Sequence, residues 1–354
     1  MRPFLSLPLL LTLLACTPEP EATEPSQDLT ETFRSTLEQQ AEQAFESGNL
    51  VVPGRDGWLF FAPELRSLAV GTFWGEAALE ASRAPRDDAK DPLPAILDFQ
   101  RQLEERDIRL LFVPVPAKAA VYPGKIVDAL HEAREAGPPP RLDLAHGEFL
   151  RILEREGVET LDLLALYRDH WAEGEDRLHC RQDTHWSGRG LELAAREIAR
   201  RLGTPEWLEQ TRKDHPLPEV TSTSREVEIT GDLWRDLEPA DGTKPPKETV
   251  PLTFLPSIQT RRDSPVLLLG DSHVLVFHAG GDLHAQGAGL PEHLSRELGT
   301  PVDLIGVRGS GATPARVNLL RRGDGLAGKK VVVWVLSVRE YTEGQGWQKV
   351  PVER

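Results

Sequence analysis

The segment that most constrains the fold of this chain is residues 265–273, PVLLLGDSH in one-letter code. Its apolar run has the length of a buried strand and ends abruptly in Gly270-Asp271-Ser272. Glycine permits a sharp turn there, and the serine hydroxyl then projects from the carboxyl edge of the sheet, where open α/β sheets bind ligands. Turns of this composition also form for conformational reasons alone, so other segments must distinguish a reactive serine from a structural one.

Segments of strand and helix character alternate along the sequence. Apolar strands are expected at residues 109–116, 157–163, 266–270, 302–307 and 331–336, and amphipathic helices at 93–106, 142–156, 190–202, 291–298 and 315–321. A connection through a helix returns the chain to the same end of a sheet, so this alternation predicts parallel pairing. We therefore expect an α/β fold with a doubly wound, mainly parallel sheet and helices on both faces. A hairpin or edge strand is expected at residues 58–61.

Residues 1–15 have the pattern of a secretory signal peptide. Met1-Arg2 is positively charged, and the apolar run that follows is too short to span a bilayer. Leu13-Leu14-Ala15-Cys16 resembles the bacterial lipobox, which implies cleavage before Cys16 and lipid attachment to its thiol. Because Thr17 rather than Asp follows, the resemblance favours the periplasmic face of the outer membrane. An ordinary signal peptide with an incidental cysteine is the alternative.

The remaining chain is expected to form one domain, residues 35–354, that contacts the membrane only through the lipid anchor. Residues 16–34 are rich in Pro, Glu and Thr and are predicted to be a disordered tether. Residues 205–262 are charged and proline-rich, and we expect an irregular insertion that covers the site, with 231–234 as an ordered contact. The net charge of −15 and the lack of a cationic block argue against nucleic acid as a partner.

A second motif, DTHWS at residues 183–187, supplies what a serine nucleophile requires. A serine hydroxyl needs a base to take its proton, and a carboxylate to orient that base. The spacing lets the Asp183 carboxylate reach the near ring nitrogen of His185 and leaves the far nitrogen free. Ser187 is a suitable N-cap for the following helix. The alternative is that Asp183 is a turn residue and His185 an ordinary histidine.

The histidines and the two cysteines also prompt a search for a metal site. His179, Cys180, Asp183 and His185 could nominally ligate zinc. No second cysteine pair and no His-Glu-x-x-His motif accompanies them, so we expect neither a metal nor a cofactor. Three further histidines show no ligand spacing and are expected at the surface: His278, His284 and His293.

Taken together, the motifs resemble those of the SGNH-hydrolase-like alginate O-acetyltransferase family, the AlgJ and AlgX type. The matching segments, in the family's order, are GRDGWLF at 54–60, VPVPAK at 113–118, VYP at 121–123, DTHWS at 183–187 and GDS at 270–272. The resemblance implies an SGNH-hydrolase-like (flavodoxin-like) fold. It also implies that Ser272 is the nucleophile, His185 the general base and Asp183 its orienting carboxylate.

The tetrahedral oxyanion of acyl transfer requires preorganised donors. The backbone N–H of Ser272 is one candidate, and Gly309 and Gly311 in the loop after strand 302–307 are others. That loop can equally be a plain strand-to-helix turn. SGNH enzymes commonly use an asparagine here, but Asn318, the only asparagine after the nucleophile, falls in a predicted helix. Candidate substrate contacts are Trp186, Lys118 and Arg308.

The function implied by the resemblance is a periplasmic O-acetyltransferase that acetylates an exopolysaccharide through an acyl-serine intermediate. The acetyl donor would be supplied by a membrane-bound O-acyltransferase. Two alternatives stay open: a carbohydrate esterase or deacetylase that uses the same triad, and a non-catalytic polysaccharide-binding or assembly scaffold that keeps only the fold.

Overall fold

The computed structural model describes residues 27–132, 137–219, 221–239 and 242–353. The predicted signal peptide at 1–15 and the predicted lipidation site, Cys16, lie outside these residues. Among the helices in the described ranges, none combines the length and the apolar character needed to cross a membrane.

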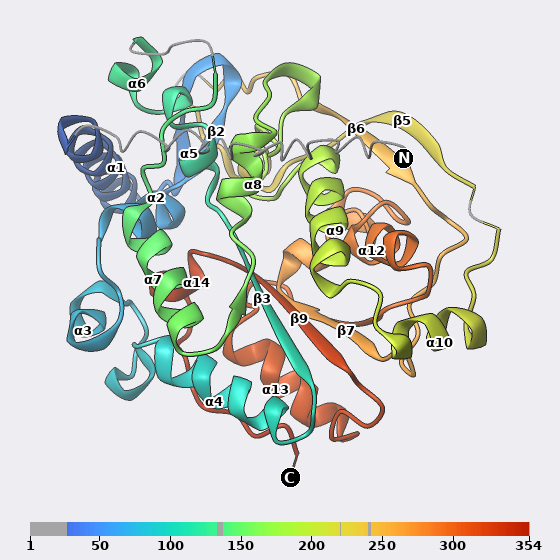
Figure 1. Cartoon of the computed structure of the whole chain (residues 1–354). Coiled ribbons are helices and arrows are strands. Elements are labelled where there is room, and N and C mark those ends of the chain that lie inside the picture. Colours follow the sequence, from blue (N-terminus) through green and yellow to red (C-terminus); the bar gives the residue numbers. More distant parts are fainter. Residues whose placement is uncertain (1–26, 133–136, 220, 240–241, 354) are drawn as a thin grey trace, which may run out of the picture.

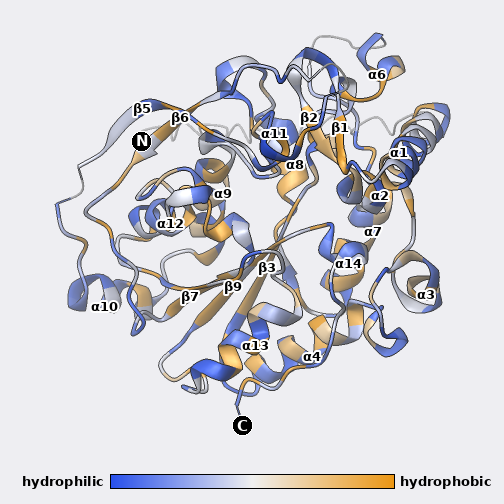
Figure 2. Cartoon of the chain, turned by 180° about the vertical axis from the view of Figure 1, so that it is seen from behind, coloured by the Kyte–Doolittle hydropathy of each residue, from blue (hydrophilic) through white to orange (hydrophobic). Residues whose placement is uncertain are grey.

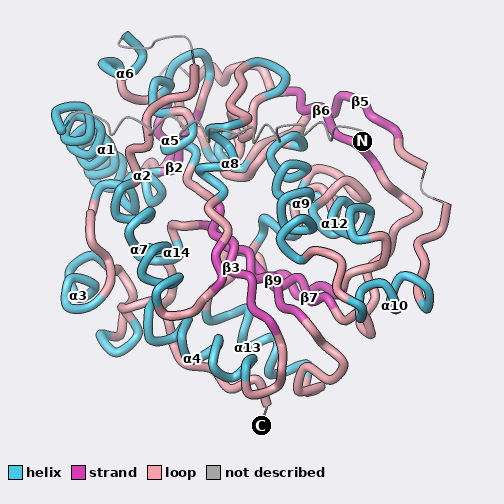
Figure 3. Tube along the Cα trace, in the orientation of Figure 1, coloured by secondary structure: helices cyan, strands magenta, loops and turns pink. Residues whose placement is uncertain are grey.

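A five-stranded, wholly parallel sheet lies at the centre of the molecule, between two groups of helices (Figures 1 and 3). The strand order is β4-β3-β9-β7-β8. The bounds are β3 (Arg109–Val115), β4 (Glu159–Thr160), β7 (Val266–Gly270), β8 (Asp303–Gly306) and β9 (Val331–Ser337). The five predicted strands, their parallel pairing and the fold class are thereby confirmed, although β4 is much shorter than the apolar segment that contains it.

The last strand in the sequence, β9, occupies the middle of the sheet. Val331 pairs with Arg109 of β3 on one side and with Val266 of β7 on the other. All seven residues of β9 are buried, as expected for a parallel strand that is covered on both faces. The carboxyl ends of β3, β9 and β7 consequently meet at one edge.

Alternating residues of each strand point to opposite faces and pack into two separate cores. Leu110 and Phe112 belong to one core, and Leu111 and Val113 to the other. The first core is covered by α1 (Gln27–Ser47), α2 (Ala62–Ala69), α4 (Leu93–Glu104), α7 (Leu144–Arg155) and α13 (Thr313–Arg322). The second is covered by α9 (Gly188–Leu202), α10 (Glu206–Asp214) and α12 (Leu290–Leu298). Figure 2 shows β3, β9 and β7 of the central sheet as mainly hydrophobic, and the two cores cover both faces of the sheet as predicted.

Shorter elements complete the fold. The predicted hairpin is present as β1 (Val51–Pro53) paired antiparallel with β2 (Leu59–Phe61). The others are α3 (Ala78–Ala81), α5 (Lys118–Val121), α6 (Asp128–Glu132), α8 (Leu163–Asp169), β5 (Thr223–Glu228), α11 (Asp232–Asp236), β6 (Thr249–Phe254) and α14 (Glu340–Glu343).

Two sequence-based expectations need correction. The tether predicted at residues 16–34 cannot extend past residue 26, because α1 begins at Gln27 and fully buries Phe33. The region 205–262 is not irregular, because it contains α10, α11 and an antiparallel ribbon of β5 and β6. The expected ordered contact at 231–234 is present as the start of α11, whose Asp232 reaches the site.

Candidate active site

The structure brings Ser272, His185 and Asp183 together in one hydrogen-bonded chain. Ser272 follows β7, and its Oγ lies 2.7 Å from Nε2 of His185. Nδ1 of the same ring lies 2.6 Å from Oδ1 of Asp183. These are the contacts in which a histidine accepts the serine proton while a carboxylate fixes its tautomer. The three residues are 8%, 5% and 1% exposed, respectively, so the chain of bonds is shielded from water.

Asp271, directly before the serine, fixes the turn that positions Ser272. Oδ1 of Asp271 accepts the backbone N–H of His273 at 2.8 Å, and Oδ2 accepts the N–H of Ser337 from β9 at 2.7 Å. A Cβ on Gly270 would collide with the carbonyl oxygen of Val335. Glycine at this position therefore allows β7 and β9 to approach closely as the chain turns, and the Asp271 carboxylate fixes the turn between them.

His273, directly after the serine, is a structural neighbour of the base. Its Nδ1 lies 2.9 Å from Oδ1 of Asp271, and its ring packs 4.8 Å from the His185 ring and 5.2 Å from that of Trp186. Burial lowers the pKa of His273 despite the adjacent Asp271. A neutral His273 adds no positive charge beside His185.

The orienting carboxylate is anchored on its second oxygen as well. Oδ2 of Asp183 accepts the backbone N–H of Asp232 at 2.8 Å and lies 2.9 Å from Nε2 of His284. Asp232 in turn accepts both the N–H and the hydroxyl of Thr184, at 2.8 and 2.6 Å. The loop that carries the base is thus fixed against α11 by the two residues that precede His185.

The charges around His185 set its basicity. Burial alone would lower the pKa of His185, but the charge and hydrogen bond of Asp183 outweigh it, and the pKa is raised. Burial opposes ionisation of Asp183 too, yet His185 and His284 hold its pKa well below the usual range. Burial raises the pKa of Asp232, and the nearby charge of Asp183 raises it further. Among the neighbouring carboxylates, Asp183 therefore raises the pKa of His185 most.

The three predicted oxyanion donors differ in how well their positions suit that role. The N–H of Ser272 has no acceptor within hydrogen-bonding distance among the described residues, so it is available to a substrate oxygen. Gly311 runs beside the turn, since a Cβ there would come within 2.8 Å of the Asp271 nitrogen. Gly309 faces open space. Gly311 stays a candidate donor, whereas the position of Gly309 gives no support for that role.

Two of the three predicted substrate contacts are wrong. Lys118 is fully buried, and its Nζ donates to the carbonyl oxygens of Leu59 and Arg181 at 2.7 and 3.1 Å. Trp186 is fully buried in the second core. Neither side chain therefore presents a surface that a ligand could contact. Arg308 is exposed and forms an ion pair with Asp282 at 2.6 Å, and its role as a contact stays a prediction.

The prediction that three further histidines lie at the surface is wrong for two of them. His284 and His293 are buried, and half-buried His278 lies 2.6 Å from Glu292. The side chains considered for zinc do not converge as a set, because His179 bonds to the carbonyl oxygen of Pro116 and Cys180 to that of Trp186.

Ligand atoms of Asp183, His185 and Asp232 do lie within 4.8 Å of one another. Each of them is already engaged in the hydrogen bonds of the site. The donor set is thus satisfied within the protein.

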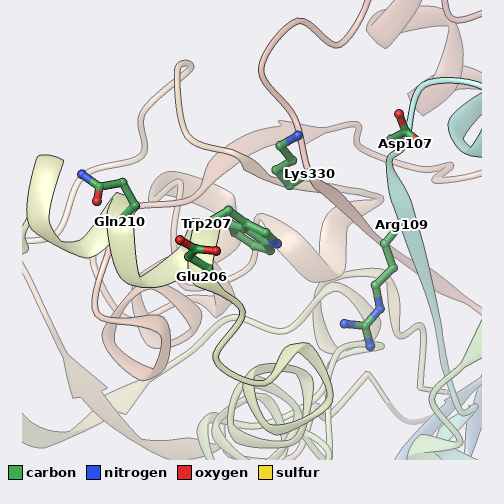
Figure 4. Close-up of a pocket in the computed structure, with 6 residues that line it drawn as sticks. All are labelled: Asp107, Arg109, Glu206, Trp207, Gln210 and Lys330. Carbon is green, nitrogen blue, oxygen red and sulfur yellow. The ribbon is translucent and has the colours of Figure 1, made fainter.

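Two cavities differ in their relation to this site. One, of about 450 Å³, adjoins it and is lined by residues that include Thr184, Asp232 and Arg339. The other, of about 680 Å³, lies at the opposite edge of the sheet, where β3 and β9 begin (Figure 4). Its lining residues are Asp107, Arg109, Glu206, Trp207, Gln210 and Lys330. The first cavity includes Asp232, whose backbone N–H donates to the Asp183 carboxylate, whereas Ser272 itself is a lining residue of neither cavity.

Comparison with known proteins identifies the family of this chain. Residues 51–338 match the family model described as "SGNH hydrolase-like domain, acetyltransferase AlgX". The chain belongs to this family. The match spans every strand of the central sheet and the whole constellation of Ser272, His185 and Asp183.

Individual relatives agree with that membership. The chain is 31% identical over 183 residues to the protein named "Probable alginate O-acetylase AlgJ" of Pseudomonas aeruginosa, covering 52% of this chain and 40% of that protein. The protein of the same name in Pseudomonas putida is 26% identical over 230 residues, covering 64% and 51%. The chain thus spans about half the length, or less, of the curated relatives that it matches.

Solved structures show the same fold. The "O-Acetyltransferase Domain of Pseudomonas putida AlgJ" matches with a TM-score of 0.58 and 22% identity, covering 82% of this chain and 91% of that domain. Pseudomonas aeruginosa AlgX matches with a TM-score of 0.54 and 15% identity, covering 81% of this chain and 61% of that one. The family model confirms the predicted family, and these structures confirm the predicted fold.

The sequence reasoning missed several residues that build the site. Asp271 has a local signal, because an aspartate before a short helical turn commonly caps it. Asp232 stood in the segment expected to be an ordered contact. His284 had no signal, since its partner Asp183 is 101 positions away in the chain.

Proposed function

We propose that this protein is an O-acetyltransferase that transfers an acetyl group to a hydroxyl of an exopolysaccharide through an acetyl-Ser272 intermediate. The observation that carries the proposal is the unbroken chain from Ser272 Oγ through both nitrogens of His185 to Asp183. Relatives named as alginate O-acetylases support acetyl as the group transferred and a polysaccharide as the acceptor.

The reaction has two halves that use the same three residues. Ser272 Oγ attacks the acetyl carbonyl as its proton moves to Nε2 of His185, and the oxyanion that forms is stabilised by the free N–H of Ser272. Collapse expels the donor's leaving group, which takes the proton from His185. The acceptor hydroxyl then attacks acetyl-Ser272, His185 removes its proton, and the serine oxygen leaves and regains a proton from His185.

The charges that line the cavity beside the site indicate which kind of acceptor it would favour. Among its lining residues it has three carboxylates, on Asp232, Asp236 and Glu238, and two guanidiniums, on Arg235 and Arg339. Arg339 is paired with Glu64 and Arg235 with Asp236. This balance, and the net charge of −15, favour a neutral acceptor segment over a polyuronate, because like charges in a cavity repel.

The cellular setting completes the proposal. The signal-peptide pattern at 1–15 and the lipobox that ends in Cys16 support export and a lipid anchor at the periplasmic face of the outer membrane. A membrane-bound O-acyltransferase would then deliver the acetyl group across the inner membrane.

The lipid anchor can be tested by labelling with palmitate. We expect labelled palmitate to be incorporated into the wild type and not into Cys16→Ser. Equal labelling of the two proteins would contradict the anchor.

The central test is to capture the intermediate. The protein is incubated with a chromogenic acetyl ester, quenched in acid, and analysed by peptide mass spectrometry. We expect an acetyl adduct on Ser272 in the wild type and none in Ser272→Ala. Ser264→Ala is the matched control, because Ser264 is buried at the other end of β7, where its hydroxyl accepts the N–H of Val266.

Adding a neutral or a uronate oligosaccharide then separates transfer from hydrolysis. Acetylated oligosaccharide is the result expected of a transferase, and the preferred oligosaccharide identifies the charge of the acceptor. Free acetate alone, with every acceptor tried, would indicate an esterase. An undiminished reaction in Ser272→Ala would remove the serine from the mechanism altogether.

A further inference from the structure

The Asp183 carboxylate, which orients His185, also contacts a second imidazole, that of His284. Nε2 of His284 lies 2.9 Å from Oδ2 of Asp183, whereas His185 uses Oδ1 of the same carboxylate. The His284 side chain is only 5% exposed and that of Asp183 only 1%. A carboxylate only accepts, so Nε2 of His284 carries the hydrogen and donates it.

The backbone at His284 adopts a rare conformation that aims this ring. Its φ and ψ are 74° and −48°, and the N–H of Ala285 donates to the carbonyl oxygen of Leu283 at 2.9 Å. This is a γ-turn with positive φ, which is strained for a residue with a side chain. The ring also packs against Phe277, with centroids 5.9 Å apart. Strain of this kind persists where the surrounding structure requires it, and it clusters at functional sites.

We propose that His284 is a positioning residue for catalysis, which holds the Asp183 carboxylate so that Oδ1 stays directed at His185. The proposal rests on the proposed function, because it takes Ser272 as the nucleophile and His185 as its base. Oδ2 of Asp183 has only two donors among the described residues, His284 and the N–H of Asp232. Without the imidazole, one peptide N–H remains to fix that oxygen.

Loss of His284 has a predictable effect on the base. The Asp183 carboxylate would carry more of its charge toward His185 once a donor is removed, and this raises the pKa of His185. Other charged or titratable groups that act on the pair would be unchanged. They include Asp232 and Arg235 in α11, Asp271 and His273 in the turn after β7, Lys118 in α5, and His179 and Cys180 before the loop. The carboxylate would also gain rotational freedom, so fewer molecules would have the reactive geometry.

The test uses two variants of matched size, His284→Gln and His284→Met. Gln keeps an N–H near the position of Nε2, and Met fills similar space without a donor. The readout is the rate at which phenylmethanesulfonyl fluoride modifies Ser272, followed by intact-protein mass spectrometry across a range of pH. This rate reports the nucleophile and its base, and needs no acceptor. His278→Ala is the control, because His278 also pairs with a carboxylate, Glu292, but does not contact Asp183.

We expect the Met variant to react about 10-fold more slowly than the wild type, with the pH midpoint raised by roughly half a unit. The Gln variant is expected to retain most of the rate, and His278→Ala to match the wild type. Equal rates and midpoints in the Met and Gln variants would overturn the role of His284 and leave the proposed function standing. No modification of Ser272 in the wild type would overturn the proposed function as well.

If His284→Met does not fold, His284→Ala takes its place in the comparison with His284→Gln, and the same outcomes apply. Circular dichroism and thermal melting of each variant identify which pair to compare.

Discussion

At the scale of single residues, the strength of the base depends on one buried carboxylate. The pKa of His185 is raised because Asp183 outweighs burial. His185 must be neutral to take the serine proton, so Ser272 should react faster as pH rises, with a midpoint above about 6.5, the ordinary histidine value. The pH dependence of the acetylation burst measures this midpoint directly.

Asp183→Asn is the corresponding variant. Loss of the charge should lower the midpoint, and loss of the correct tautomer should reduce the plateau rate by about 10³- to 10⁴-fold. A midpoint that stays in place or rises in this variant would show that Asp183 does not set the basicity of His185.

The same residues show why part of the site could be predicted. Asp183 and His185 stand two positions apart, and Ser272 ends an apolar strand, so each has a local signal. His284 and Asp232 bind Asp183 from positions 101 and 49 residues away. Only the folded chain brings them together, and Lys118 and Trp186 were misassigned because burial is not visible in a motif.

At the scale of elements, alternation of strands and helices was sufficient to predict a parallel sheet but not its order. β9 follows all other strands in the sequence and yet lies between β3 and β7. Its apolar run is typical of any strand buried on both faces. The position matters because β9 carries Ser337, whose N–H holds Asp271, and leads into α14 beside the site.

The first residue of α14, Glu340, should make stability depend on pH. Burial raises its pKa to about 7, although a hydrogen bond from the Ser310 hydroxyl opposes this change. The folded state therefore binds this proton more tightly than the unfolded state, where a glutamate has a pKa of about 4.3. The contribution of Glu340 is most favourable below that value, and it is lost as pH rises to about 7.

Glu340→Gln isolates this contribution, because the amide stays neutral. Relative to the variant, the wild type should lose about 3 to 4 kcal/mol of unfolding free energy between about pH 4 and pH 8, because each pH unit between the folded and unfolded pKa values contributes on the order of 1.4 kcal/mol. Urea denaturation of both proteins across this range measures the difference. Parallel curves would show that the pKa of Glu340 is not raised in the folded protein.

At the scale of the whole molecule, the sheet separates two cores, and the N-terminal helix completes one of them. α1 contributes Phe33 and Leu37 to the core that also contains Leu65 and Leu68 of α2. The sequence of its first turns, rich in Glu, Gln and Thr, resembles a tether because few of its side chains are apolar. Those few face a surface that the sequence alone does not reveal, and burial against it outweighs the composition.

The extent of the domain can therefore be tested at Phe33. If α1 is an integral layer, Phe33→Ala leaves a cavity in the core and should lower the free energy of unfolding by about 3 kcal/mol. Glu38→Ala, at a position of the same helix outside the buried face, should change it by less than about 0.5 kcal/mol. Urea denaturation followed by circular dichroism compares the two variants. Equal stability would mean that α1 is not docked in solution, and that a tether extending to residue 34 describes the chain better than a helix beginning at Gln27.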